Sequence, residues 1–255
     1  MVEYNIGKEY LTFGSGHSSR GTQVKYHMGG YWYKTNNVGN EALAEELTSK
    51  VLECSNHSNF VQYEMCIING KTGCRSKHFL NKGESFITLQ RLYQSYVGGE
   101  LVNKMRTLSS PEERFAYLVD LVNETIGMDI SNYLRNTFSL DMLICNPDRH
   151  FHNLGIIADE SGGVREAPIF DNGQGLAQNF SITPPYMDHE EKCGQLMSAS
   201  ISGSFEAQVA ASGNSLKIDY DKLYEVLNEY ADSPAKTFLI EQLEKYKNIF
   251  KAHHP

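Results

Sequence analysis

The spacing of apolar residues changes once along the chain, near residue 90, and this change limits the possible folds. Before that point short alternating runs predict strands, at 31–33, 60–68 and 86–89. One helix is expected among them, over 41–52, because Leu43, Leu47 and Val51 recur four residues apart. The first part of the chain is therefore expected to be a small sheet with a single helix.

Beyond residue 100 helical spacing dominates. Helices are expected at 111–126, 129–142, 219–230 and 235–250. Two short apolar runs, 154–158 and 167–170, flank a Gly-Gly turn and predict a β-hairpin. The sequence therefore predicts an α+β fold with two lobes: a β-rich lobe at 1–90 and a mainly helical lobe at 91–255. Ligands commonly bind in the cleft between two such lobes.

Composition narrows the function classes. The 255 residues carry 23 Lys and Arg against 31 Asp and Glu, a net charge of −8, which disfavours general nucleic-acid binding. The sequence shows no signal peptide and no apolar run near the roughly 20 residues of a membrane span. We therefore expect a cytoplasmic protein that binds neither membrane nor nucleic acid directly, with secretion or delivery to other cells left open. Five cysteines, an odd number, predict reduced thiols and not a disulfide framework.

One polar segment carries the clearest chemistry. Asp148 and Asn153 lie five residues apart between a predicted helix and the hairpin, and Asp171 ends the second hairpin run. Phosphoryl transfer requires a carboxylate to orient the attacking hydroxyl and oxygen ligands for Mg²⁺. Asp148 is the candidate base, and Asn153 and Asp171 are the candidate metal ligands. Asn-Pro-Asp is also an ordinary turn sequence, but the pairing with Asp171 favours the catalytic interpretation.

The first lobe offers phosphate-binding candidates. Residues 18–25 form a polar, glycine-containing loop whose backbone amides suit phosphate oxygens. Lys34 follows on the next predicted strand, and Glu41 and Glu45 lie on the helix after it. A strand lysine, a helix glutamate and a distant Asp–Asn–Asp set occur in the order found in kinases. Either glutamate suits Lys34; we prefer Glu41.

The sequence resembles the HipA family of bacterial serine/threonine kinases, which are distantly similar to eukaryotic protein kinases and phosphatidylinositol 3/4-kinases. Residues 146–153, Asn-Pro-Asp-Arg-His-Phe-His-Asn, match the family's N-x-D-R-H-x-x-N catalytic loop. Residues 18–25 match its S-x-x-G-x-Q-x-K phosphate loop, and Asp171 falls at its second metal-binding aspartate. Together these motifs cover about residues 12–175, and the catalytic loop is the most specific of them.

The resemblance implies a protein-kinase-like fold, ATP and Mg²⁺ as cofactors, and Ser or Thr hydroxyls of a protein as acceptors. It implies roles for the residues that match. Asp148 would be the base, with Asn153 and Asp171 on the metal; the residues expected to contact ATP are Ser18, Gly21, Gln23, Lys25, Lys34, Glu41, Gln90 and Leu92. The backbones of Gln90 and Leu92 would hold adenine where the lobes join. In some relatives the loop serine is autophosphorylated, and Ser18 occupies that position.

The phosphate loop begins by residue 18, which predicts a compact family member without the N-terminal subdomain of full-length HipA. For such a form the usual antitoxin contact, DNA binding through it and a tRNA-synthetase target are not expected to carry over. A separate antitoxin or regulator protein stays open. Two other functions stay open as well: a kinase for a small-molecule or lipid hydroxyl, and a nucleotide-binding interaction module without turnover.

Overall fold

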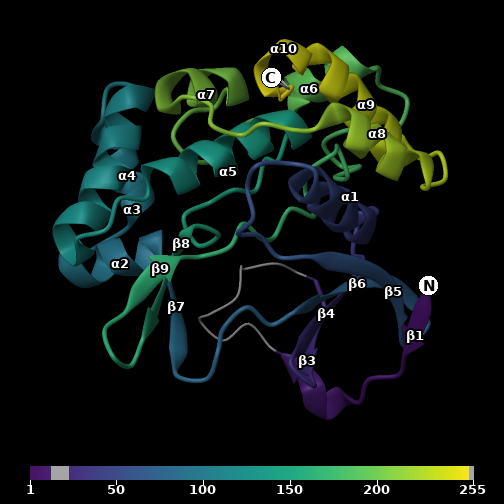
Figure 1. The fold of residues 1–255 in the computed structure, drawn as a ribbon, viewed down its shortest axis with the longest axis horizontal. Helices are drawn as coiled ribbons and strands as arrows, with labels where there is room; N and C mark the ends of the chain where they lie inside the picture. Colours follow the sequence, from purple (N-terminus) through teal and green to yellow (C-terminus); the bar gives the residue numbers. More distant parts are fainter. Residues whose placement is uncertain (13–22, 253–255) are drawn as a thin grey trace.

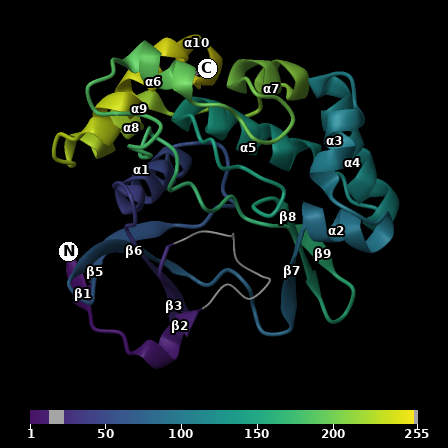
Figure 2. The ribbon, with the colours of Figure 1, turned by 180° about the vertical axis from the view of Figure 1, so that it is seen from behind.

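A computed structural model describes residues 1–12 and 23–252. Within them the chain forms two sheets and a group of helices, and Figure 1 shows the helices above the larger sheet, with the smaller sheet beside it. Figure 2, from behind, shows the same separation between the strands of residues 2–77 and the helices that follow.

The larger sheet has six strands in the order β1-β5-β6-β4-β3-β2. Its strands are β1 (Val2–Tyr4), β2 (Leu11–Thr12), β3 (Lys25–Met28), β4 (Tyr31–Thr35), β5 (Tyr63–Ile68) and β6 (Lys71–Lys77). β1 pairs with β5 in parallel, and the other neighbours are antiparallel. Lys25 of β3 lies directly opposite Lys34 of β4, so the register brings two lysines together.

The smaller sheet has three antiparallel strands, β7 (Glu84–Thr88), β8 (Gly155–Asp159) and β9 (Val164–Glu166), with β7 at one edge. The expected hairpin forms, but its second strand is Val164–Glu166 and not 167–170. The Asp159 side chain accepts the backbone N–H groups of Ser161 and Gly163, which closes a tight turn and starts the return strand early. Residues 167–170 instead run on toward Asp171.

The helices are α1 (Glu41–Glu53), α2 (Leu89–Tyr96), α3 (Leu101–Thr107), α4 (Pro111–Ile126), α5 (Ser131–Ile144), α6 (His189–Gln195), α7 (Phe205–Ser212), α8 (Tyr220–Asn228), α9 (Pro234–Lys245) and α10 (Lys247–Phe250); a 3-10 turn spans Lys8–Tyr10. Local chemistry fixes their ends. The Ser110 hydroxyl accepts the N–H of Glu113 at the start of α4, and Gly127 ends that helix at φ 72°. The single helix expected over 235–250 breaks at Tyr246 into α9 and α10.

Helix α1 belongs to the β-rich half of the sequence but packs into the core of the helical half. Ala44, Leu47 and Val51 are fully buried in the same apolar cluster as residues of α5, α8 and α9. The backbone N–H of Asp219 donates to the carbonyl of Cys54, just beyond the helix, at 2.8 Å. Burial at about 25 cal/mol per Å² of apolar surface makes this face of α1 a substantial stabilising contact.

The expected α+β class with a small β-rich part, one helix and a mainly helical second part is confirmed. The predicted boundary near residue 90 falls inside α2, directly after β7. No helix in the described part of the chain is long and apolar enough to cross a membrane. All five cysteines are free thiols.

Gly73 in β6 provides a test of how tightly the larger sheet is packed. A Cβ added there would lie 2.3 Å from the backbone oxygen of Lys34 on β4. Gly73→Ala is therefore expected to lower the free energy of unfolding by about 1–3 kcal/mol, measured by urea denaturation. Gly194→Ala in α6 is the control, because a Cβ there meets nothing within 4 Å. Equal stability of the two variants would contradict this packing.

Candidate active site

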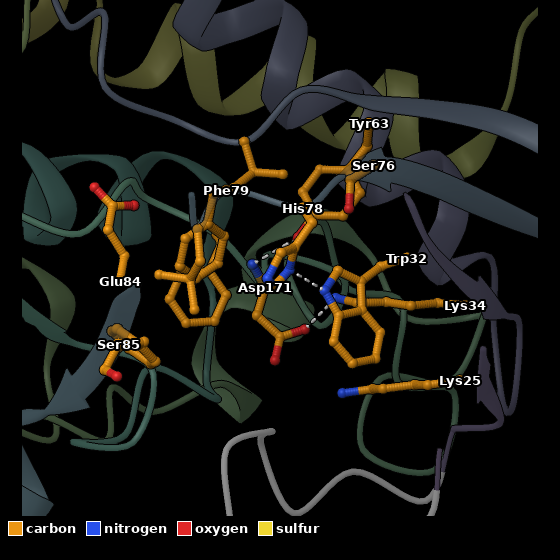
Figure 3. Close-up of a pocket in the computed structure, with 14 residues that line it drawn as sticks. Lys25, Trp32, Lys34, Tyr63, Ser76, His78, Phe79, Glu84, Ser85 and Asp171 are labelled. Atoms are coloured by element: carbon orange, nitrogen blue, oxygen red, sulfur yellow. Dashed lines mark hydrogen bonds and ion pairs between the residues drawn. The ribbon is translucent and has the colours of Figure 1, made fainter. Parts of the chain in front are cut away.

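A cavity of about 250 Å³ opens between the two sheets (Figure 3). Its polar end carries Lys25, Lys34 and Asp171, and its apolar end carries Phe79, Phe86 and Phe170. The remaining lining residues are Trp32, Val61, Tyr63, Ser76, His78, Leu80, Glu84 and Ser85. A charged end joined to an aromatic end suits a ligand with an anionic group and a flat apolar one.

Lys34 is the centre of the polar end. Its ammonium donates to Glu45 at 2.9 Å and to Asp171 at 2.7 Å, and it lies 5.1 Å from the centre of the Tyr63 ring. Burial alone would lower the pKa of Lys34, but the Asp171 and Glu45 carboxylates outweigh it and hold that pKa well above its usual value. The lysine therefore remains charged and holds α1 against the Asp171 segment.

The preference for Glu41 as the partner of Lys34 is wrong: the partner is Glu45. The Glu41 carboxylate instead accepts the backbone N–H groups of Asn37 and Val38, ahead of its own helix. That position lies in the first turn, where free backbone N–H groups attract a carboxylate. Glu45, one turn further along α1, reaches both Lys34 and the backbone N–H of Asn172.

The Asp171 segment is held in an unusual backbone conformation. Asp171 has φ 59°, in the left-handed region that few residues other than glycine occupy. Its N–H donates to the Tyr63 hydroxyl at 3.2 Å, while the N–H of Asn172 donates to Glu45 at 2.8 Å. These two bonds fix the direction of the Asp171 carboxylate, which Figure 3 shows between the two lysines and the aromatic residues. Such local strain is often found at functional sites.

The second lysine, Lys25, lines the cavity from β3. Burial lowers its pKa, and the neighbouring Lys34 adds to this effect, while Asp171 opposes it. Two lysines within one small cavity provide a strong attraction for an anion. Gln23 lies just before β3 and does not line the cavity. The predicted contacts at Ser18 and Gly21 lie outside the described residues.

The segment after α5 carries the remaining predicted catalytic residues, and Asp148 lies close enough to Asp171 for the two carboxyl groups to interact. The side chain of Asp148 is 53% exposed. Even so, partial burial raises the pKa of its carboxyl, and Asp171 adds to the rise while His150 opposes it. The Asn153 side chain donates to the backbone oxygen of Asp148 at 3.1 Å.

The oxygen atoms of Asn153 and Asp171 are of the kind that a hard cation accepts. The Oδ1 atom of Asn153 is buried and has no hydrogen-bond partner among the described residues. An amide oxygen and a carboxylate oxygen are the ligand types that Mg²⁺ accepts from proteins, with its other positions filled by phosphate and water. A buried carbonyl oxygen without a partner costs free energy, which a bound cation would recover.

Arg149 fastens the Asp148 segment to the Asp171 segment. Its guanidinium is fully buried and forms an ion pair with Asp141 of α5 at 3.1 Å. It also donates to the backbone oxygen of Phe170 and to Oδ1 of Asn172, both at 2.5 Å. One arginine therefore holds three separate stretches of chain in a fixed arrangement. Arg149 lies within the motif at residues 146–153, but the residue types of that motif alone indicate no role for it.

Gln90 and Leu92, the expected adenine contacts, do not line the cavity. Both are buried at the start of α2. The first three N–H groups of this helix already have acceptors, namely Leu154 O, Phe151 O and the Thr88 hydroxyl. The Gln90 side chain bonds to the backbone of Gly99 and Leu101. The expectation is therefore wrong because the chain turns into a helix there and satisfies these groups internally.

The residues that line the apolar end come instead from three segments. Phe86 lies on β7, Phe170 ends the 167–170 run, and Phe79 lies where the sequence indicated no strand or motif. Phe79, Phe86 and Phe170 have ring centres 5.4–5.8 Å apart, largely edge to face. Trp32 lies on the strand of Lys34, and its indole N–H donates to His78 Nδ1 at 2.7 Å. Trp32 was interpreted as a core residue. Its spacing of two from Lys34, which places both side chains on one face of β4, could have identified it.

Comparisons with known proteins agree with this architecture. Protein-family models and curated proteins gave no match to the sequence. Among solved structures, the Helicobacter pylori proinflammatory kinase CtkA superposes with a TM-score of 0.63 at 13% identity, over 98% of this chain and 94% of that one. Shewanella oneidensis HipA, in a complex with HipB and operator DNA, superposes with a TM-score of 0.52 at 13% identity, over 93% of this chain and 67% of that one. The chain therefore has the fold of the HipA-like kinases, as the resemblance of its motifs predicted.

Arg149→Met tests the central role of the buried guanidinium. The substitution leaves Asp141 as an unpaired buried carboxylate, so we expect the free energy of unfolding to fall by about 3–5 kcal/mol in urea denaturation. Arg149→Met with Asp141→Leu should recover part of the loss, because no charge remains buried. A single variant as stable as the wild type would contradict the role assigned to Arg149.

Proposed function

We propose that this chain is an ATP- and Mg²⁺-dependent kinase that transfers the γ-phosphoryl group of ATP to Ser or Thr hydroxyls of a protein. The observation that carries the proposal is the contact of Lys34 with both Glu45 and Asp171 at 2.9 and 2.7 Å. Active kinases require a lysine–glutamate ion pair and a metal-binding aspartate in place together. The fold shared with HipA-like kinases supports the same conclusion.

In this proposal each of these side chains has a separate role. Asp148 accepts the proton of the acceptor hydroxyl, and its half-exposed side chain leaves room for a macromolecular substrate. Lys34 and Lys25 hold the phosphates. Asn153 Oδ1 and the Asp171 carboxylate hold Mg²⁺. When bound, the metal neutralises the charge of the phosphate oxygens.

The edge of β7 is the proposed adenine site, in place of Gln90 and Leu92. Residues alternate in an antiparallel strand, so every second residue turns its backbone N–H and C=O away from the partner strand. The backbone N–H of Leu89 faces β8, because it donates to the carbonyl of Leu154. Phe86 and Glu84 lie three and five residues earlier, so their backbone N–H and C=O groups face away from β8. A carbonyl at Glu84 and an N–H at Phe86 suit the amino group and ring nitrogen of adenine, and the phenylalanine cluster suits its ring faces.

Two finer parts of the proposal concern regulation. Autophosphorylation of Ser18 is proposed from the motif at 18–25, since Ser18 lies outside the described residues. A separate regulator protein is also proposed, because the HipA structure that this chain resembles contains HipB. Mass spectrometry after incubation with ATP tests the first part: unmodified Ser18 in an enzyme that consumes ATP would exclude it.

Removal of the base and of the metal ligand tests the reaction itself. Asp148→Gln should lower phosphoryl transfer by about 10²–10⁴-fold, since the acceptor proton loses its base. Asp171→Asn should abolish detectable transfer. ATP consumption and transfer from labelled ATP to protein measure both effects, and a thermal-unfolding curve like that of the wild type confirms the fold. Full activity in both variants would overturn the assignment.

Glu45 and Glu41 form a matched pair, because they lie four residues apart on α1. Glu45→Gln weakens the hold on Lys34 and should lower ATP turnover by about 10²-fold, the effect of a small displacement of a positioning group. Glu41→Gln should leave turnover near that of the wild type, because the Glu41 carboxylate accepts the N–H groups of the loop before its own helix while Glu45 pairs with Lys34. The reverse ranking in a steady-state assay would contradict the pairing seen in the structure.

The substrate class needs its own experiment. Phosphosites compared across the proteome of cells expressing the wild type or Asp148→Gln should show new phosphoserine or phosphothreonine only with the wild type. Phosphorylated metabolites or lipids without new protein phosphosites would instead favour the small-molecule alternative. ATP binding without consumption would favour the non-catalytic binding module.

A further inference from the structure

Two cysteine side chains meet beside the catalytic loop, outside the cavity described above. Cys145 ends α5, and Cys193 lies on α6, 48 residues later in the numbering of the chain. The Gln242 amide of α9 contacts both sulfurs, at 3.7 Å from that of Cys193. Cys145 and Cys193 are also close enough for each to shift the pKa of the other. The two sulfurs therefore share one amide donor and lie near each other.

Cys193 has the surroundings of a reactive thiol. His189 lies one helical turn earlier on α6, with its Nε2 atom 3.6 Å from the Cys193 sulfur. The other ring nitrogen of His189 lies 2.8 Å from Glu241 on α9. Hydrogen bonding from Cys145 lowers the pKa of Cys193, and Lys245 lowers it further against the effect of burial. Cys193 is also partly exposed, so a small oxidant can reach it.

The other cysteines differ from Cys193 in their exposure and in the direction of their pKa shift. Cys54, Cys66 and Cys74 are buried, and burial raises the pKa of each, to about 11 for Cys66. Cys145 is likewise buried, at 4% exposure, but it has Cys193 beside it. Cys193 thus has the features of an attacking thiolate, and Cys145 those of the thiol that resolves it.

Cys145 is directly connected to the catalytic loop. Its backbone has φ 48°, a conformation that is costly for a residue with a Cβ. The next residue, Asn146, accepts the N–H of Asp148 through its side chain at 3.1 Å and donates to Asp141 at 3.2 Å. Any restraint on the Cys145 side chain therefore acts one residue before Asn146, whose side chain holds the start of the catalytic loop.

We propose that Cys193 and Cys145 form a peroxide-sensitive thiol pair that closes to an intramolecular disulfide and ties α6 to the catalytic loop. The Cys193 thiolate attacks a hydroperoxide: an S–O bond forms, the O–O bond breaks, and the leaving oxygen takes a proton to become water or alcohol. The Cys145 sulfur then attacks the sulfenic acid. The S–S bond forms, the S–O bond breaks, and the hydroxide leaves with the Cys145 proton as water. Two thiols lose two electrons in total, and one hydroperoxide gains them.

Hydrogen peroxide added to the native full-length chain tests the proposal. The wild type should lose the mass of two hydrogen atoms, yield one linked peptide pair containing Cys145 and Cys193, and return to its starting mass with dithiothreitol. Cys54→Ser is the matched control and should behave like the wild type. Thiols that stay unmodified until the protein unfolds, or a disulfide between other cysteines, would overturn the proposal.

Single variants separate the two roles. In Cys145→Ser the oxidation of Cys193 should stop at the sulfenic acid, which dimedone labels; Cys145→Gly, which suits the left-handed backbone, should give the same result if the serine variant folds poorly. In Cys193→Ser the buried Cys145 should stay unmodified at the same dose. Oxidation of Cys145 at the wild-type rate in Cys193→Ser would contradict the order of attack.

Hydrogen exchange tests the connection to the loop without relying on kinase activity. Disulfide formation restrains local opening, so amides of residues 146–153 should exchange more slowly in the oxidised wild type than in the reduced form. The Cys145→Ser variant should show no such change on peroxide treatment. Equal exchange in the oxidised and reduced wild type would show that the disulfide does not reach the catalytic loop.

Discussion

A lysine ammonium buried away from water requires nearby carboxylates, and Lys34 has two, from parts of the chain that lie far apart in sequence. Glu45 is almost fully buried on α1, and Asp171 follows the smaller sheet. Removing Lys34 would leave two neighbouring carboxylates uncompensated in a region of low dielectric constant, which costs several kcal/mol. Lys34 and its two carboxylate partners therefore fix the larger sheet, α1 and the Asp171 segment relative to one another. The polar end of the cavity forms as a consequence.

Arg149, like Lys34, holds separate parts of the chain together, and it does so on the other side of Asp171. Its donors are divided among Asp141, Phe170 and Asn172, so the Asp148 segment is tied to the Asp171 segment through a buried guanidinium. Some kinases use a phosphorylated activation loop, paired with arginine, to order the active state. Arg149 is fully buried and already paired with Asp141, so it is unsuited to bind an added phosphate group. Its position makes the arrangement of the Asp148 and Asp171 segments a property of the folded chain.

Much of this arrangement could be predicted where local chemistry determines the result. The helix expected at 111–126 forms with those bounds, between the Ser110 cap and Gly127, and the motif spacing identified Asp148 and Asp171, whose carboxyl groups the fold brings close enough to interact. Predictions failed where a tertiary contact decides between similar local options. Glu41 and Glu45 share a helix face, but only the position of β4 selects Glu45. The resemblance placed the Gln90 backbone at the join of the lobes, free to hold adenine, but the Thr88 hydroxyl and the carbonyls of Phe151 and Leu154 stabilise a helix there. Phe79 has no neighbouring motif, so only the folded chain connects it to Phe86 and Phe170.

The packing of α1 affects how the site can be regulated. In many kinases the lysine–glutamate pair breaks when the helix carrying the glutamate moves. Here Ala44, Leu47 and Val51 place that helix in the main apolar core, next to α8 and α9. Moving it would expose several fully buried side chains at about 1.5–3 kcal/mol for each large one. Control by displacement of α1 would therefore cost several kcal/mol, so we expect α1 to stay in place whether the site is occupied or empty.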